Sequence, residues 1–126
     1  MDELKDILVD VYLYGELASY GGKAASYGFA NLQVKLKEGS VIRELLDYLG
    51  IPAEKRGITF INGVLSAMPG LQPDLDHALK DNDRVAFFDL KSMWPFQYRH
   101  GATMIGEMAR ALSSEKDKGL HHTYNQ

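Results

Sequence analysis

The sequence predicts an α+β domain, a mixed sheet with one main helix, followed by a linker and a C-terminal helix. Several short stretches alternate apolar and polar residues, which is typical of half-buried β-strands. One stretch, residues 41–49, instead spaces its apolar residues along one face of a helix. The expected order of elements is strand, strand, helix, strand, short strand, strand.

The first two strands are expected at residues 7–17 and 31–37. In the first strand the aliphatic residues share one parity, and Tyr12 and Tyr14 share the other. In the second, leucine and valine alternate with glutamine and lysine. This pattern places one face of the strand in the core and the other in solvent.

A loop of small residues is expected between these strands, at residues 19–28. Its Gly-Gly-Lys sequence at 21–23 lacks the earlier glycine and the following Ser or Thr of a phosphate-binding loop. We therefore interpret it as a flexible connection. With Tyr20 and Tyr27 exposed, this loop could serve as a contact site.

The main helix is expected to follow Ser40 and to end at Gly50. The Ser40 hydroxyl is suited to accept a hydrogen bond at the helix N-cap. Gly50 tolerates the left-handed conformation of a C-cap, and Pro52 follows as a stop signal. The apolar stripe of this helix contains Ile42, Leu45, Leu46 and Leu49.

Three further strands are expected at residues 58–61, 64–65 and 85–90. Asn-Gly at 62–63 is a strong hairpin signal, because both residues tolerate positive φ. The polar residues at 81–83 predict a tight turn before the last strand.

Neither the acidic residues nor the histidines are spaced as a metal site. A calcium loop requires a distal glutamate and a central glycine, which the acidic cluster lacks. We interpret this cluster as a solvated turn region; it contains Asp74, Asp76, Asp81 and Asp83. His77 is expected to be a solvated turn residue, and His100, His121 and His122 have no suitably placed partner.

Residues 92–126 differ in character from residues 1–91, so we expect a sheet domain at 1–91 and an extension at 92–126. The extension begins with the bulky residues Met93, Trp94, Phe96 and Tyr98. Helical spacing then runs from 103 to 118, with an apolar stripe of Met104, Ile105, Met108, Ala111 and Leu112. Two arrangements are open: the extension folds back on the sheet, or its aromatic residues form an arm that binds a partner, as such residues often do.

Composition narrows the classes of function. The net charge of −3 without basic clusters argues against nucleic-acid binding. The absence of cysteine excludes disulfides and thiolate catalysis. No nucleophile–base pair is recognisable, so we expect neither an enzyme nor a resident cofactor. No signal peptide and no apolar run near the ~20 residues of a membrane helix is present, so a cytoplasmic location away from membranes is expected.

Four short motifs occur in an order and spacing that resemble one known family. The first, Val-Tyr-Leu-Tyr-Gly-Glu-Leu at 11–17, resembles an opening strand that ends in aromatic-Gly-x-Leu. The others are a glycine turn with a helix start at 39–46, a strand ending in Asn-Gly at 58–63, and a Leu-x-Asp-Asn-Asp-x-Val turn at 79–85. Together they resemble the ubiquitin-like β-grasp family of the molybdopterin-synthase small subunit and the thiamine sulfur carrier. Asn82 replaces the glycine usual in the last turn, and asparagine also tolerates the left-handed region.

The resemblance implies a β-grasp fold, with the first and last strands side by side at the sheet centre. It also implies a role as a sulfur carrier in molybdopterin or tungstopterin cofactor biosynthesis. In that family a C-terminal Gly-Gly carboxylate is adenylated by a partner enzyme and then carries sulfur as a thiocarboxylate. Here those positions fall near Met93 and Trp94, which could not thread the partner's channel. Gly101 is the candidate acceptor after proteolytic processing; alternatively it is only a hinge before the last helix.

A second function is compatible with the same resemblance. The chain could be a non-catalytic accessory subunit that kept the fold and lost the Gly-Gly chemistry. Its partner would be an adenylating enzyme or a larger synthase or oxidoreductase subunit. The candidate partner-binding residues are Phe88, Trp94, Phe96 and Tyr98.

Overall fold

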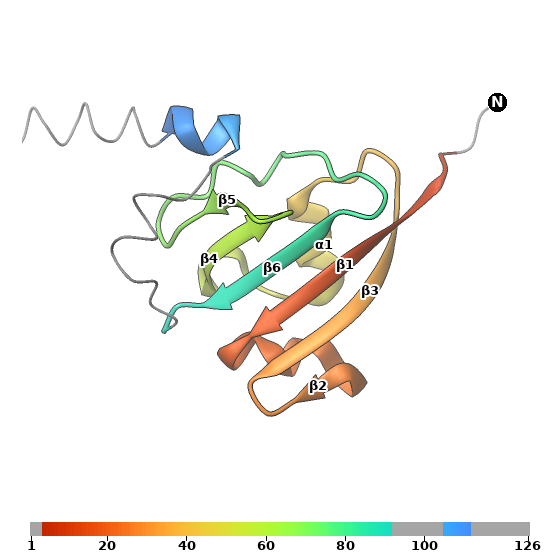
Figure 1. The fold of residues 1–126 in the computed structure, drawn as a ribbon, viewed down its shortest axis with the longest axis vertical. Helices are drawn as coiled ribbons and strands as arrows, with labels where there is room; N and C mark the ends of the chain where they lie inside the picture. The colour runs from red at the N-terminus through yellow and green to blue at the C-terminus, as the bar shows by residue number, and fades with distance from the viewer. Residues whose placement is uncertain (1–3, 92–104, 112–126) are drawn as a thin grey trace, which may run out of the picture.

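The chain is an α+β protein built on a mixed six-stranded sheet in the computed structural model, which describes residues 4–91 and 105–111 (Figure 1). The strands are β1 (Asp6–Tyr14), β2 (Ala25–Ser26), β3 (Phe29–Lys37), β4 (Arg56–Ile61), β5 (Val64–Ala67) and β6 (Arg84–Asp89). The remaining elements are the helix α1 (Ile42–Leu49) and the 3-10 helices η1 (Gly15–Ala24) and η2 (Ala53–Lys55). The predicted class, a mixed sheet with one main helix, is confirmed.

The sheet has the strand order β2-β3-β1-β6-β4-β5, so the first and the last long strands are central neighbours. β1 and β6 run parallel, whereas β1 pairs with β3, and β4 with both β5 and β6, in antiparallel fashion. Val11 lies opposite Val85, and Leu13 opposite Phe87. The apolar parity of both central strands therefore projects from one face. This arrangement is compatible with the expected β-grasp order.

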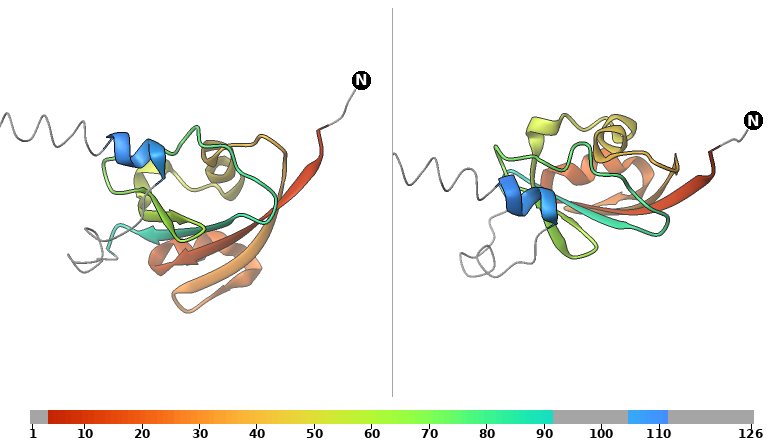
Figure 2. Two further views of the ribbon diagram at one scale, coloured as in Figure 1. Left: turned by 45° about the horizontal axis from the view of Figure 1, so that its top comes forward. Right: turned by 90° about the horizontal axis from the view of Figure 1, so that it is seen from above.

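The main core lies between that face and α1. Figure 2 shows α1 and η1 on the same side of the sheet. Ile42, Leu45 and Leu46 of α1 and Leu17 of η1 are buried against it. Because apolar residues spaced three and four apart lie on one side of a helix, α1 buries three residues of the predicted stripe, partly buries Leu49, and leaves its polar side in water. Gly50 ends α1 in the left-handed conformation, as expected.

The connection after β1 differs from the prediction. The strand ends at Tyr14, and Gly15 adopts a φ of 67°, which breaks the extended backbone. Residues expected to form a flexible loop are the 3-10 helix η1, which packs closely on β3 because Gly21 has no side chain to meet Ala30. Tyr20 is therefore partly buried against the main core, whereas Tyr27 is fully exposed as expected.

The start of α1 also differs slightly. The N-cap position is Val41, so the prediction that Ser40 caps the helix was wrong. Ser40 is buried, and its carbonyl oxygen accepts a hydrogen bond from the Leu79 N–H at 2.7 Å. The Glu44 carboxylate instead accepts a hydrogen bond from the Val41 N–H at 3.0 Å. Ser40 is thus held by a hydrogen bond from Leu79, a residue far along the chain, and a preference for helix caps could not reveal this contact.

The segment between β5 and β6 is not the solvated acidic region that the sequence suggested. Asp74 is fully buried and pairs with Arg56 of β4, and Asp83 is also buried. Asp76 and Asp81 are exposed, as expected. The interpretation failed for Asp74 because its cationic partner lies 18 positions earlier in the chain.

The C-terminal part of the described chain packs on the other side of the sheet. Residues 106–111 are helical. Met108 is fully buried against Ile58, Phe60 and Leu65, and Ile105 packs beside it. The described part of the predicted apolar stripe therefore folds back on the sheet. No helix among residues 4–91 and 105–111 is long and apolar enough to cross a membrane.

Candidate functional site

The sheet face opposite α1 carries adjoining aromatic rings from four strands. Side chains alternate along a strand, so Tyr12 and Tyr14 point away from the main core that Val11 and Leu13 enter. The rings of Tyr14 and Phe88 stack with centroids 4.5 Å apart and planes 8° from parallel. On either side, Phe29 lies 5.3 Å from Tyr14, and Phe60 meets Phe88 edge-on at 6.2 Å. These contacts make one aromatic surface.

A groove of about 360 Å³ crosses this surface. We call it the aromatic groove; it is lined by Tyr12, Tyr14, Phe60, Gly63, Arg84, Ala86 and Phe88. Ala86 lies opposite Tyr12 on one neighbouring strand and Phe60 on the other. A small residue between larger ones leaves the hollow. The volume is near the lower end of ligand pockets, roughly 300–1,000 Å³, and suits one or two side chains of a partner.

Near the aromatic groove, the side chains of Tyr12 and Asp10 have hydrogen-bond partners, whereas the Arg84 guanidinium has no ion-pair partner among the described residues. The Tyr12 hydroxyl donates a hydrogen bond to Asp10 Oδ2 at 2.8 Å, and Asn31 Nδ2 donates to Asp10 Oδ1 at the same distance. The hydrogen bond to Asp10 raises the pKa of Tyr12, so its hydroxyl stays protonated. The Arg84 N–H donates to Asn62 Oδ1 at 2.8 Å. Its guanidinium forms no ion pair with any carboxylate in the described parts of the chain.

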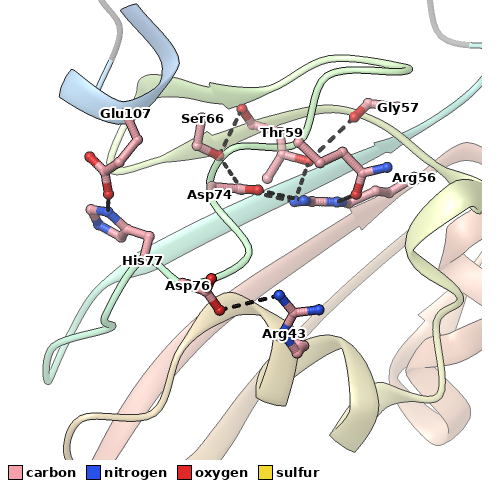
Figure 3. Close-up of polar contacts among 10 residues, drawn as sticks. Arg43, Arg56, Gly57, Thr59, Ser66, Asp74, Asp76, His77 and Glu107 are labelled. Atoms are coloured by element: carbon pink, nitrogen blue, oxygen red, sulfur yellow. Dashed lines mark hydrogen bonds and ion pairs between the residues drawn. The ribbon is translucent and has the colours of Figure 1, made fainter. Parts of the chain in front are cut away.

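One end of this face is covered by residues 105–111. The Ile105 N–H donates to the Leu65 carbonyl oxygen at 3.0 Å. Beside it, His77 Nδ1 lies 2.5 Å from Glu107 Oε2, and Figure 3 shows the two side chains pointing at one another. This hydrogen bond from His77 lowers the pKa of Glu107. His77 is thus not the purely solvated residue expected, because it anchors the C-terminal helix.

A buried polar cluster lies on the other side of the sheet, between β4, β5 and the segment that follows β5 (Figure 3). Arg56 Nη1 and Nη2 donate to the two oxygens of Asp74 at 2.9 and 2.5 Å. The Ser66 hydroxyl donates to Asp74 Oδ2 at 2.8 Å, and Arg56 Nε donates to Gln72 at 2.8 Å. No buried side-chain polar atom of the described residues lacks a partner. Because the charges of Arg56 and Asp74 neutralise each other inside the fold, we interpret this cluster as structural: it holds the segment after β5 against β4 and β5.

Of the predicted partner-binding residues, Phe88 lies in the aromatic groove. Gly101, Trp94, Phe96 and Tyr98 lie outside the described residues. The sequence interpretation missed Tyr12, Tyr14 and Arg84 as site residues. For the two tyrosines the sequence did indicate a position on the face away from the core, since both have the parity opposite to the aliphatic residues of their strand.

Among residues 4–91 and 105–111, no group of three His, Asp or Glu side chains is placed to hold a metal ion. No protein-family model matches the sequence, and no curated protein matches it.

Proposed function

We propose that this chain is a ubiquitin-like β-grasp protein, related to the molybdopterin-synthase small subunit and the thiamine sulfur carrier, that acts by binding a partner protein. Two observations support the kinship. The four motifs lie at a strand end, a helix start, a hairpin and a tight turn of the structure. The first and last long strands are parallel central neighbours, with the helix on one face.

The observation that carries the binding function is the aromatic groove. Tyr12 and Tyr14 remain partly exposed in a surface whose rings adjoin one another. Tyrosine and arginine are enriched among residues that dominate binding energy, because they combine a large contact area with polar groups. The groove contains both types, in Tyr12, Tyr14 and Arg84. A partner that filled it would exclude water from these side chains.

The anchoring of the C-terminal helix favours an accessory subunit over an unprocessed sulfur carrier. A carrier needs a free C-terminal carboxylate on a segment that can reach a nucleotide. Gly101 lies four positions before Ile105, which is bonded to β5, and Met108 is fully buried. In the intact chain Gly101 has no terminal carboxylate, because residues 102–126 follow it.

The carrier function is the second candidate, and the strand order with its four motifs favours it. A protease would cut after Gly101. The new carboxylate would attack the α-phosphate of ATP on an adenylating enzyme, and pyrophosphate would leave. A sulfur nucleophile would then displace AMP and give the thiocarboxylate.

The two functions are separated by purifying the protein from its native cells. For the accessory subunit we expect a chain that continues past Gly101 and a co-purifying partner. Tyr14→Ala and Phe88→Ala should each reduce recovery of that partner, whereas Tyr48→Ala, on an exposed side chain of α1, should not. Circular dichroism would confirm that each variant is folded. A chain ending at Gly101 with an oxygen-to-sulfur mass increase would establish the carrier instead. Unchanged partner recovery with both groove variants would contradict the proposed binding surface.

A further inference from the structure

The rim of the aromatic groove carries one charge that the described fold leaves without an ion-pair partner. Asp10 lies directly opposite Arg84 on the neighbouring strand and would be the natural partner. Both Asp10 oxygens, however, accept hydrogen bonds from Tyr12 and Asn31. Asn31 is itself fixed, because its amide also donates to the Val11 carbonyl oxygen at 3.1 Å. Asp10 is thus engaged by these two donors, and no ion pair between Asp10 and Arg84 occurs in the described part of the chain.

Beside this cation the groove is lined mainly by aromatic and other apolar side chains. The stacked rings of Tyr14 and Phe88 present faces and edges suited to an aromatic or branched aliphatic side chain. The Tyr12 hydroxyl is turned to Asp10 and offers its hydrogen to that carboxylate. Arg84 thus supplies a charged donor to an incoming group, and an arginine fork matches the geometry of a carboxylate.

Resting on the proposed partner-binding function, we propose that the aromatic groove recognises an apolar side chain standing next to a carboxylate on the partner protein. The apolar group lies against Tyr14 and Phe88, and the carboxylate pairs with Arg84. Charge complementarity selects this occupant. A basic partner group would meet Arg84 with like charge, and an uncharged one would leave its cation unpaired in a desolvated interface.

A small probe tests this recognition without the natural partner. Hydrocinnamate joins a phenyl ring to a carboxylate by two methylene groups, and hydrocinnamide is its uncharged counterpart. We would titrate each into the full-length chain and follow the backbone amide signals by NMR. A fragment of this size is expected to bind with a Kd on the order of millimolar. Hydrocinnamate should shift the amides of Tyr14, Arg84 and Ala86, and hydrocinnamide should bind roughly fivefold more weakly because it loses a charge-assisted hydrogen bond.

Three variants complete the test. Arg84→Gln should remove the preference for hydrocinnamate over hydrocinnamide, and Arg84→Lys should restore part of it because the charge returns. Arg43→Gln is the matched control, since Arg43 is an exposed arginine of α1 that is already paired with Asp76. It should leave the preference unchanged.

Equal affinity for the two probes, or shifts confined to residues outside the groove, would overturn the proposal. So would the absence of any shift at saturating probe. These results are distinct from a failure of the proposed function. If hydrocinnamate binds as expected but Tyr14→Ala and Phe88→Ala leave the native partner bound, the groove is a real site and the partner uses another surface.

Discussion

At the scale of single residues, the buried ion pair Arg56–Asp74 is expected to contribute strongly to the stability of the fold. Both side chains are fully buried, and the Arg56 guanidinium lies 5.9 Å from the centre of the Phe87 ring. The two-pronged contact holds the segment after β5 against β4. Removing one partner would leave the other charge buried without compensation, and this is far more costly than losing an exposed pair.

Asp74→Ala is therefore expected to lower the free energy of unfolding by about 3–5 kcal/mol. Urea denaturation followed by circular dichroism would measure this. Asp76→Ala is the matched control: Asp76 forms a single exposed contact with Arg43, and such pairs contribute ~0–1 kcal/mol. Similar losses of stability in the two variants would contradict the interpretation that Asp74 holds the segment after β5 against β4.

Gly15 offers a second prediction at this scale. Its φ is 67°, and a Cβ placed there would collide with the Asp89 carboxylate, which accepts the Glu16 N–H at 2.7 Å. Gly39 also has positive φ, but a Cβ there meets nothing. Gly39→Ala should cost about 1 kcal/mol from backbone strain alone. Gly15→Ala should lower the urea midpoint clearly further, because it adds the collision; equal midpoints would show that Asp89 moves aside freely.

At the scale of elements, three described residues, Ile105, Glu107 and Met108, hold the start of the C-terminal helix to the rest of the fold. Ile105 gives one backbone hydrogen bond to β5, Met108 fills an apolar site, and Glu107 pairs with His77. Because these contacts include one with the edge strand β5, this segment is expected to open locally without unfolding of the sheet. The Ala109 N–H, bonded to the Ile105 carbonyl oxygen at 3.0 Å, reports on this opening.

The protection of the Ala109 amide from hydrogen exchange should depend on pH through Glu107. The bond from His77 lowers the pKa of Glu107 below its ordinary 4.5. A depressed folded-state pKa means that the stabilisation is fully present above pH 4.5 and is lost as the pH falls through the lowered value. Glu107→Gln should thus lower the protection factor above pH 4.5 and converge with the native chain at lower pH.

Glu54→Gln, in η2, serves as the control for this pH dependence, since Glu54 is exposed and belongs to a different element. It should leave the protection of Ala109 unchanged at every pH. An unchanged protection factor in Glu107→Gln would mean that Ile105 and Met108 hold the helix without the ion pair.

At the scale of the whole molecule, the buried apolar residues of the described chain form two separate clusters. The main core contains buried residues from Ile7 to Phe87 and none from the C-terminal helix. The second cluster joins Met108 to Ile58, Phe60 and Leu65. The sheet and α1 can therefore bury their main core without the extension.

A fragment of residues 1–91 is accordingly expected to fold. It should unfold in a single cooperative urea transition, with a lower midpoint than the full chain because Ile58, Phe60 and Leu65 lose the cover of Met108. Exposed apolar surface also favours association, so the fragment should elute larger than a monomer in size-exclusion chromatography with light scattering. A fragment without a cooperative transition would contradict the predicted domain boundary at residue 91.

Local signals were reliable wherever a residue's role depends on its neighbours in sequence. The alternation in β1 and β3, the stripe of α1, and the turns at Asn62 and Asn82, which both have positive φ, were readable from the chain. Phe88, which the sequence suggested as a partner-binding residue, lies in the aromatic groove, and its role in binding stays a prediction. Each of these follows from side-chain periodicity or from a backbone preference of one residue type.

The amino-acid sequence by itself thus determined the α+β class, the order of the main strands and helix, and which parity of β1 and β3 enters the core. Only the tertiary structure decided the partners of residues whose contacts are distant in sequence. It buried Asp74 against Arg56, joined His77 to Glu107, and placed Arg84 opposite an Asp10 that accepts hydrogen bonds from Tyr12 and Asn31. The physical reason is that charge pairing and burial depend on distance in space, which local propensity does not encode.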